Sequence, residues 1–366
     1  MYIEKLVLKN YRNYAYETFE FSKGVNIVSG LNAQGKTNAA EAIFFLCTGY
    51  SPRAGKDKQV VKYDADQAVI SASAHSRYGS VSAKIVFDKK DGKKIFVNEM
   101  PVAKTGELLG NINAVMFDPQ QLKLVQESPE DRRRFMDIAL SEVSRKYFYA
   151  LLKYRKILQQ RNGLLKEQDV GLIYETLPVW DEQLCSVAAE IIAARNDFLT
   201  DLKPFAASAH YEITGGAEKL DVCADQKFEG DERDIKESLK NKLSECIDKD
   251  IELGYTSIGP HRDDIKIKIH DADARVFASQ GQQRTAALSL KLGELRILEK
   301  RFGEYPVFIL DDAMSELDRT RQERLLCMLD GIQTIFTCTD AENFIRKGAK
   351  VFVVKNGSIA DQSFAN

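Results

Sequence analysis

The feature that most constrains the fold of this chain is the octapeptide at residues 30–37, Gly-Leu-Asn-Ala-Gln-Gly-Lys-Thr. It fits the phosphate-loop pattern G-x-x-x-x-G-K-[ST] at every position. An apolar run at residues 25–28 precedes the loop, and an apolar helical pattern at residues 38–47 follows it. In such a strand–loop–helix unit the backbone N–H groups and the helix dipole converge on a phosphate. The sequence therefore predicts a nucleoside triphosphate site, against the alternative of an ordinary glycine-turned connection.

Each residue of this loop has an expected role. Lys36 is expected to reach the β- and γ-phosphates during catalysis, and the Thr37 hydroxyl is expected to hold Mg²⁺. The other expected nucleotide contacts are Gly30, Leu31, Asn32, Ala33, Gln34, Gly35 and Asn38. ATP and Mg²⁺ are thus the predicted ligands.

Two carboxylates follow a second apolar strand far along the chain, where Asp311 and Asp312 end the run at residues 307–310. A phosphate-loop ATPase needs one carboxylate to complete the Mg²⁺ shell, and often a second to orient the attacking water. We assign Asp311 to the metal and Asp312 to catalysis, although two acids can also simply end a strand. Because both halves must meet on one triphosphate, the two ends of the chain are expected to form one head, with the middle inserted.

A third motif, at residues 279–284, precedes a predicted helix at residues 285–301. Ser279, Gly281 and Gln282 combine a hydroxyl with backbone N–H groups at a helix start, which suits an anion. The motif could serve the phosphate already bound by residues 30–37, or cap the triphosphate of a second molecule. An ordinary capped helix is the third possibility.

The rest of the chain predicts an α/β protein with an inserted, mainly helical domain. Helical patterns prevail at residues 128–253, and the stretches 143–166 and 179–202 are expected to pair as an antiparallel hairpin. Strands are expected at residues 2–8, 16–21, 25–28, 69–74, 80–87, 95–97, 113–117, 264–269, 306–310, 334–339 and 351–354. We expect residues 1–120 and 255–366 to form the two parts of the head, and residues 121–254 to form the helical insertion.

Composition limits the classes of protein that need to be considered. The chain has 366 residues and a net charge of -2, which argues against a dense nucleic-acid-binding coat but allows a local basic patch. No apolar run approaches the roughly 20 residues that span a bilayer. The six cysteines are scattered without metal-ligand spacing, so free thiols and a cytoplasmic location are expected.

Together these motifs resemble those of ABC-type ATPases. Residues 30–37, 279–282, 308–312 and 315–318 look like the Walker A, signature, Walker B and D-loop motifs, and their wide separation resembles the SMC-like branch. Within that branch, residues 9–14, 128–137, 259–264, 279–285 and 309–318 are similar to stretches of the RecF family of recombination mediators. The similar stretches extend over nearly the whole chain.

The resemblance implies an ABC-type ATPase head and an ATP-dependent homodimer with two ATP molecules between the subunits. Gln120 is implied as the Q-loop residue that contacts Mg²⁺ and the water, which makes it both a metal and a catalytic candidate. Arg12 and Asn13 are implied to lie near the phosphates. Thr339 and Asp340 stand where many ABC ATPases have a switch histidine. Asp312 replaces the more usual glutamate, which is compatible with slow, DNA-stimulated hydrolysis of ATP.

The implied function is ATP-controlled dimerisation on gapped DNA in DNA repair and replication restart, with RecO and RecR, to promote loading of RecA. DNA contacts are expected from Arg53 and Lys56 after the phosphate-loop helix, and from Arg132, Arg133 and Arg134 in the arm. The alternative for these cations is a solvated helix surface.

Two other classes of phosphate-loop protein are alternatives. A small-molecule phosphate-loop kinase would need an acceptor site and a lid, and the Ser279 motif argues against it. A transporter ATPase subunit would place the two nucleotide motifs closer in sequence and would need a membrane partner.

Overall fold

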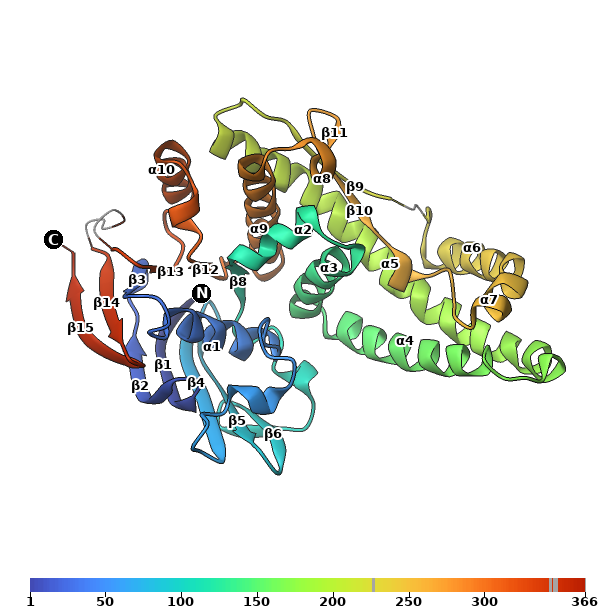
Figure 1. The fold of residues 1–366 in the computed structure, drawn as a ribbon, viewed down its shortest axis with the longest axis horizontal. Coiled ribbons are helices and arrows are strands. Elements are labelled where there is room, and N and C mark those ends of the chain that lie inside the picture. The colour runs from blue at the N-terminus through green and yellow to red at the C-terminus, as the bar shows by residue number, and fades with distance from the viewer. Residues whose placement is uncertain (226–227, 342–343, 345–347, 366) are drawn as a thin grey trace. The chain divides into compact units, whose positions relative to one another are not determined.

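The computed structural model describes residues 1–225, 228–341, 344 and 348–365. These residues divide into two compact units: a head unit of residues 1–122, 205–219 and 279–366, and an arm unit of residues 123–204 and 220–278. Figure 1 shows the elements of both. The three-segment division made from the sequence, with boundaries after residues 120 and 254, stays a prediction.

The first sheet of the head unit joins strands from both ends of the chain. Its order is β15-β14-β3-β13-β12-β8. The strands are β3 (Val25–Ser29), β8 (Ala114–Phe117), β12 (Val307–Asp311), β13 (Thr334–Cys338), β14 (Lys350–Lys355) and β15 (Ser358–Phe364). Neighbours from β14 to β8 are parallel, whereas β15 turns back antiparallel to β14. The carboxyl ends of β3 and β12 therefore meet at one edge, where open α/β sheets bind ligands.

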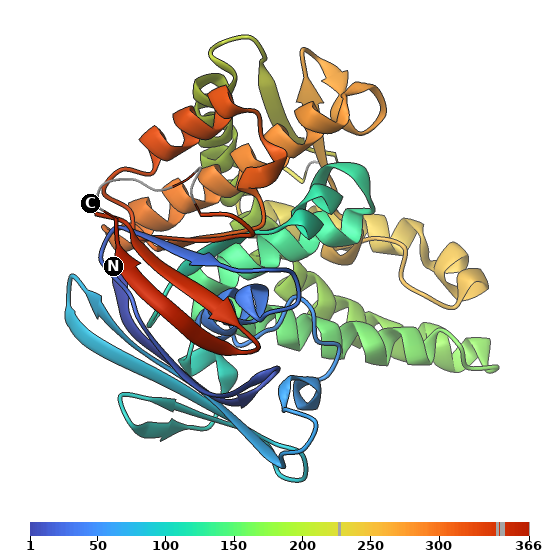
Figure 2. The same ribbon diagram turned by 60° about the vertical axis from the view of Figure 1, so that its left-hand side comes forward.

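The second sheet is antiparallel, with the order β2-β1-β4-β5-β6-β7, and Figure 2 shows it as a curved layer of long strands. The strands are β1 (Tyr2–Tyr11), β2 (Tyr14–Glu20), β4 (Gln67–Ser76), β5 (Gly79–Asp88), β6 (Gly92–Val97) and β7 (Met100–Val102). Alternate residues such as Leu6, Ile70 and Ile85 are buried, because successive side chains of a strand point to opposite faces. The predicted α/β class with an antiparallel layer is confirmed.

Three helices complete the head: α1 (Lys36–Thr48), α9 (Gln280–Phe302) and α10 (Arg319–Met328). Helix α1 contacts strands of both sheets, and it is buried along most of its length. The ring centroid of Phe45 in α1 lies 4.9 Å from that of Phe87 in β5. This burial fixes the start of α1, and with it the phosphate loop.

The arm unit is mainly helical. Its elements are α2 (Lys123–Gln126), α3 (Pro129–Val143), α4 (Arg145–Leu164), most of α5 (Val170–Thr214), α6 (Glu232–Glu245), α7 (Ile247–Leu253), α8 (Ala274–Phe277), β9 (Leu220–Ala224), β10 (Ile265–Ile269) and β11 (Ala272–Asp273). Ion pairs Lys146–Glu190 at 3.3 Å and Arg161–Asp181 at 2.6 Å join opposite ends of α4 to α5. The predicted antiparallel hairpin is thereby confirmed. None of the helices in the described residues is long and apolar enough to cross a membrane.

The helical stretch predicted at residues 179–202 is part of a longer helix, α5, which continues through Pro178 and Pro204 to Thr214. One local prediction was wrong. Strand β9 lies in a stretch that was predicted to be helical, and it pairs antiparallel with β10. Leu220 and Val222 are buried on alternate positions of β9, a period-2 pattern too short to stand out beside the helices.

Candidate nucleotide-binding site

The phosphate loop adopts a backbone shape that depends on its glycines. Gly30 and Gly35 have φ angles of 149° and 121°, a region that residues with a Cβ rarely adopt. A Cβ on Gly30 would lie 2.3 Å from the carbonyl oxygen of Val354, and one on Gly35 would lie within 3 Å of the side chains of Asn13 and Tyr14. Neighbouring strands therefore approach the loop too closely for any other residue.

Two turns that are distant in sequence hold this loop in place. From the β1–β2 turn, Asn13 Nδ2 donates to the Gln34 carbonyl at 2.8 Å and the Tyr14 hydroxyl donates to the Gly35 carbonyl at 3.0 Å. From the β14–β15 turn, the Asn356 N–H donates to Gln34 Oε1 at 2.6 Å and the Gly357 N–H to the Gln34 carbonyl at 2.9 Å. The loop shape is thus fixed by the protein itself before any phosphate binds.

Lys36 is the first residue of α1, and its side chain turns back across the loop. Its Nζ donates to the carbonyl oxygens of Gly30 at 2.8 Å and Leu31 at 3.1 Å. The residue is buried, with 4% of its surface exposed. The ammonium group is therefore held inside the ring of loop backbone where phosphate oxygens would bind.

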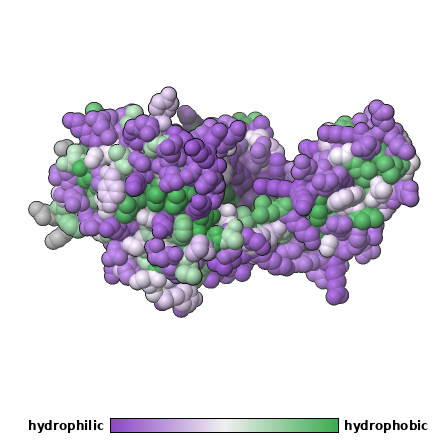
Figure 3. Space-filling view, turned by 90° about the horizontal axis from the view of Figure 1, so that it is seen from below, coloured by the Kyte–Doolittle hydropathy of each residue, from purple (hydrophilic) through white to green (hydrophobic). Residues whose placement is uncertain are grey.

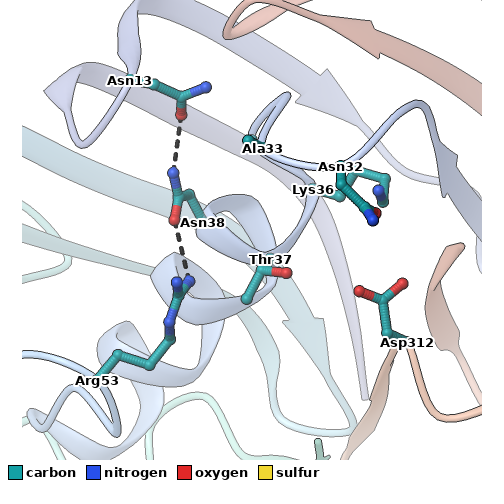
Figure 4. A pocket seen from close by; sticks show the side chains of 9 residues that line it. Asn13, Asn32, Ala33, Lys36, Thr37, Asn38, Arg53 and Asp312 are labelled. Atoms are coloured by element: carbon teal, nitrogen blue, oxygen red, sulfur yellow. Dashed lines mark hydrogen bonds between the residues drawn. The ribbon is translucent and has the colours of Figure 1, made fainter. Parts of the chain in front are cut away.

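The loop forms one wall of a cavity of about 440 Å³, a volume typical of ligand sites. It is lined by Asn13, Asn32, Ala33, Gly35, Lys36, Thr37, Asn38, Arg53 and Asp312. In Figure 4 the side chain of Asp312 faces Lys36 and Thr37 across the opening. The structure thereby brings together the loop and the end of β12, as the sequence motifs required.

Asp311 ends β12 almost completely buried, at 3% exposure. Its pKa is raised to about 6, chiefly by burial and also by the nearby carboxylates of Asp312 and Asp118. Hydrogen bonds from Thr337, whose Oγ1 lies 2.6 Å from Asp311 Oδ1, and from Thr37 act in the opposite direction. Asp311 forms no ion pair with any residue that the structure describes, and a divalent cation would supply the positive charge that an ionised carboxylate needs.

The residues present fit magnesium bound together with a triphosphate. Mg²⁺ prefers oxygen ligands and usually takes one or two protein carboxylates, with phosphates and waters completing its octahedron. Thr37 and Asp311 offer a hydroxyl and a carboxylate that already contact each other. Within the described residues no group of three or more His, Cys, Asp or Glu side chains could hold a metal alone.

Asp312 has a positive φ of 49°, which turns its side chain from the strand into the cavity. Its backbone N–H donates to Thr337 Oγ1 at 3.0 Å. Thr337 on β13 therefore contacts the carboxylate of Asp311 and the backbone of Asp312. Sequence reasoning missed it, because nothing local in the run at 334–338 links a threonine to the end of another strand.

Gln120 lies in a short 3-10 turn, η3 (Pro119–Leu122). Its side chain is exposed and does not line the cavity, while its N–H donates to Asp118 Oδ1 at 2.8 Å. Its metal and catalytic roles stay predictions. Asp118 was not singled out from the sequence, yet it is 4% exposed and its charge reaches Asp311.

The two predicted arginines near the cavity differ in position. The Arg12 guanidinium donates to both oxygens of buried Glu41, at 2.7 and 3.0 Å, and it does not line the cavity. Arg53 does line it, and its guanidinium donates to Asn38 Oδ1 at 3.2 Å. Asn38 in turn donates to Asn13 Oδ1 at 2.8 Å, and Figure 4 shows this chain of side chains. Arg53, expected on DNA, thus stands at the nucleotide cavity.

The Ser279 motif starts α9 with a capping box. Ser279 Oγ accepts from the Gln282 N–H at 3.3 Å, and Gln282 Oε1 accepts from the Ser279 N–H at 2.9 Å. Ser279 and Gly281 are exposed, and the residues that line the phosphate-loop cavity include none of this motif. The Ser279 motif of a single chain is therefore not part of the phosphate-loop cavity of the same chain.

The remaining DNA candidates have unequal surroundings. Arg132 is buried and donates to both oxygens of Asp264, at 2.6 and 2.9 Å, and Arg133 donates to the Asp263 carbonyl at 2.7 Å. Arg134 and Lys56 are exposed. Arg132 thus has a structural role in the arm unit whatever else it contacts.

A parallel core with an antiparallel layer, a phosphate loop, a strand ending in two carboxylates and a separate capped signature helix define an SMC-like ABC-type ATPase head. The family model described as "RecF/RecN/SMC N terminal domain" matches residues 2–359. An Smc head bound to the C-winged helix domain of ScpA shares the fold at a TM-score of 0.59 and 16% identity.

Proteins with higher sequence identity to this chain identify a particular family within the class of SMC-like ATPases. The DNA replication and repair protein RecF of Clostridium acetobutylicum is 41% identical over 364 residues, covering 99% of this chain and 100% of that protein. Its counterpart from Halothermothrix orenii is 42% identical over 370 residues, covering 98% of each. A solved structure of the recombination mediator protein RecF with ATP, in the RecFOR pathway, matches with a TM-score of 0.89 and 37% identity over 99% of this chain and 97% of that one. The chain belongs to the RecF family.

Proposed function

We propose that this chain is a slow ATPase of DNA replication and repair, which binds ATP and Mg²⁺ in the phosphate-loop cavity. The single observation that carries the proposal is the convergence of Lys36, Thr37 and Asp312 on one cavity of about 440 Å³, with the buried Asp311 hydrogen-bonded to Thr37. A solved relative is described as RecF with ATP, which supports the choice of nucleotide.

The roles of the side chains follow from their positions. Backbone N–H groups of the loop and the Lys36 ammonium neutralise the phosphates. Thr37 and Asp311 would hold Mg²⁺, which supplies charge neutralisation at the transferring phosphoryl group. Asp312 orients and deprotonates the attacking water from the cavity side. Arg53 adds a positive charge, held by Asn38, beside the same phosphates.

Among the described residues, those that line the cavity include none of the Ser279 motif, which is exposed elsewhere on the head unit. A second copy can supply a cap opposite the loop, with its Ser279 hydroxyl and helix start against the γ-phosphate. A two-fold dimer would bury two ATP molecules by the same contact used twice. ATP then acts as a switch, clamping two heads together until hydrolysis releases them.

The relatives are named DNA replication and repair proteins, and solved relatives are placed in the RecFOR pathway. We therefore assign the ATP-controlled dimer to DNA at single-strand gaps in the cytoplasm, where it works with RecO and RecR to load RecA. DNA would favour the dimer and so stimulate hydrolysis.

Two variants separate binding from chemistry. Ser279→Arg should keep ATP binding to the single chain but abolish the ATP-dependent dimer, because a bulky cation would fill the γ-phosphate cap. Asp312→Asn should bind ATP and accumulate as the dimer, because the amide cannot accept a proton from water. Ser363→Arg on the exposed face of β15 is the matched control.

Light scattering with ATP and with ADP, together with phosphate release, measures both effects. A Ser279→Arg protein that still dimerises with ATP would refute the proposal that Ser279 of a second copy caps the γ-phosphate. An Asp312→Asn protein that hydrolyses ATP at the parent rate would remove Asp312 from the chemistry.

A further inference from the structure

Helix α4 has a charge pattern unlike that of the rest of the chain. Its 20 residues contain the cations Arg145, Lys146, Lys153, Arg155, Lys156 and Arg161, and no Asp or Glu. The whole chain, by contrast, has 52 Lys and Arg against 54 Asp and Glu. Helix α4 therefore carries a positive charge that no acidic residue of its own offsets.

One of these six cations is structural. Arg161 is completely buried and pairs with Asp181 at 2.6 Å and Asp250 at 2.8 Å. The other five are exposed. Lys146 pairs with Glu190 at 3.3 Å, and Arg155, which is 67% exposed, lies 3.7 Å from Asp137. Lys153 and Lys156 have no ion pair with any residue that the structure describes.

Three of the five exposed cations share a face because of the helical period. At about 100° per residue, Arg145, Tyr149, Leu152, Lys153 and Lys156 fall within roughly 100° of one another around the axis. The opposite face, with Tyr147, Leu151, Tyr154, Ile157 and Arg161, is buried. Tyr149 and Leu152 are 36% and 47% exposed, so the open face offers a hydroxyl and an apolar surface among its cations.

We propose that this open face of α4 binds the sugar–phosphate backbone of double-stranded DNA without reading its sequence. The inference rests on the proposed DNA function and identifies the part of the protein that contacts the DNA. Sequence-independent binding needs cations spaced along the phosphates, and the stretch from Arg145 to Lys156 extends for about 16 Å, roughly five phosphates of one strand. Lysine side chains neutralise phosphates as mobile point charges, and the Tyr149 hydroxyl can donate to a phosphate oxygen.

The shape of the face favours a duplex over the other anionic partners. A helix is convex, and it offers no groove in which unstacked bases of a single strand could lie. An anionic membrane would need an apolar helix face to insert, and that face of α4 is buried in the arm unit. Figure 3 shows one side of the molecule, on which the surface is mostly hydrophilic with smaller hydrophobic patches.

The contacts of the other arm cations point the same way. Arg132 and Arg133 already donate to Asp264 and to the Asp263 carbonyl. Their first partners are therefore protein groups, whereas Lys153 and Lys156 are exposed and form no ion pair within the described part of the chain. Of these arm cations, the lysines of α4 are therefore the ones most readily available to contact DNA.

The test uses the full chain with ATP and a labelled 30-base-pair duplex, with binding followed by fluorescence anisotropy over a salt series. Lys153→Glu with Lys156→Glu should weaken binding on the order of tenfold or more. It should also flatten the slope of log affinity against log salt by about 1.8, since each lost phosphate contact removes about 0.9. Lys153→Ala with Lys156→Ala should show the same flattening and guards against misfolding of the reversal. Lys249→Glu, an exposed lysine of α7, is the control and should match the parent.

Other outcomes have distinct meanings. Variants that bind the duplex like the parent, with equal salt slopes, would overturn the α4 surface while leaving DNA binding intact. A parent that binds no duplex but hydrolyses ATP would overturn the DNA function and this inference together. Binding of the parent to vesicles of anionic lipid, lost in the variants, with no duplex binding, would assign the face to membranes instead. ATP hydrolysis without DNA should be equal in all proteins.

Discussion

Replacing Asp311 by Asn should stabilise the nucleotide-free head while abolishing its activity. The pKa of this carboxyl is raised from 3.8 to about 6, chiefly by burial. A raised pKa means that the folded state holds the proton more tightly than the unfolded chain. The ionised side chain therefore lowers stability progressively as the pH rises from about 4 through 6, and the full cost applies above that.

The magnitude follows from the shift. At 1.36 kcal/mol per pKa unit, the difference between 3.8 and about 6 corresponds to about 3 kcal/mol at pH 8. Asn keeps an oxygen for the Thr337 hydroxyl at the same place, so the gain should approach that value. At pH 5 the folded carboxyl is mostly protonated, and the gain should fall to roughly half.

Hydrogen exchange of amides in β12 and β13 is the suitable assay, because the single tryptophan, Trp180, lies in α5 in the arm unit. Asp330→Asn, at an exposed acid of the head unit, is the control. Opening free energies of Asp311→Asn and parent that agree at pH 8, or a variant that is less stable, would refute the reasoning. Magnesium–ATP should protect the parent more than the variant, since only the parent has the carboxylate that the metal stabilises.

Two further changes test the loop. Lys36→Ala should remove measurable ATP binding in calorimetry, because the ammonium held at the Gly30 and Leu31 carbonyls supplies the charge that faces the phosphates; parent-like affinity would contradict the assignment. Gly357→Ala should weaken ATP binding and cost about 1–2 kcal/mol of stability, because its Cβ would lie 2.4 Å from the Asn13 carbonyl oxygen. Gly331→Ala has a similar φ but open space around it, so equal losses in the two variants would show that backbone strain alone is responsible.

Local pattern was enough to predict the elements that carry the chemistry. The loop at residues 30–37 lies between a strand and a helix, and the strand before Asp311 is completely buried, because short motifs and apolar runs fix nearby backbone. The strand predicted at residues 351–354 is confirmed as part of β14, and the residues Asn356-Gly357 form the tight turn that leads into β15. The association of the two chain ends was predicted from the requirement that both nucleotide motifs meet on one triphosphate, and the parallel pairing of β3, β13 and β12 confirms it.

Side-chain partners across the fold could not be predicted in the same way. Thr337 contacts Asp311 and Asp312 from a neighbouring parallel strand, and Gly357 contacts Gln34 from the other end of the chain. Such contacts depend on strand order and register, which a single sequence does not specify. Arg53 was placed on DNA for the same reason: its charge is visible in the sequence, whereas its distance from the cavity is not.

Two features of the site affect the free energy of the nucleotide-free head in opposite directions. The phosphate loop is braced by hydrogen bonds from two turns, so binding a triphosphate need not order it. The carboxylate of Asp311 is buried and forms no ion pair with any described residue, so the empty head is held below the stability that its packing would allow. A ligand that contributes Mg²⁺ relieves this penalty only while it remains bound, which couples nucleotide occupancy to the stability of the sheet edge at β12. Asp312 and residues 315–318 follow directly on that edge. In the proposed dimer, the same coupling would therefore extend to the residues next to the shared triphosphate, and it would give ATP a physical means to control dimerisation.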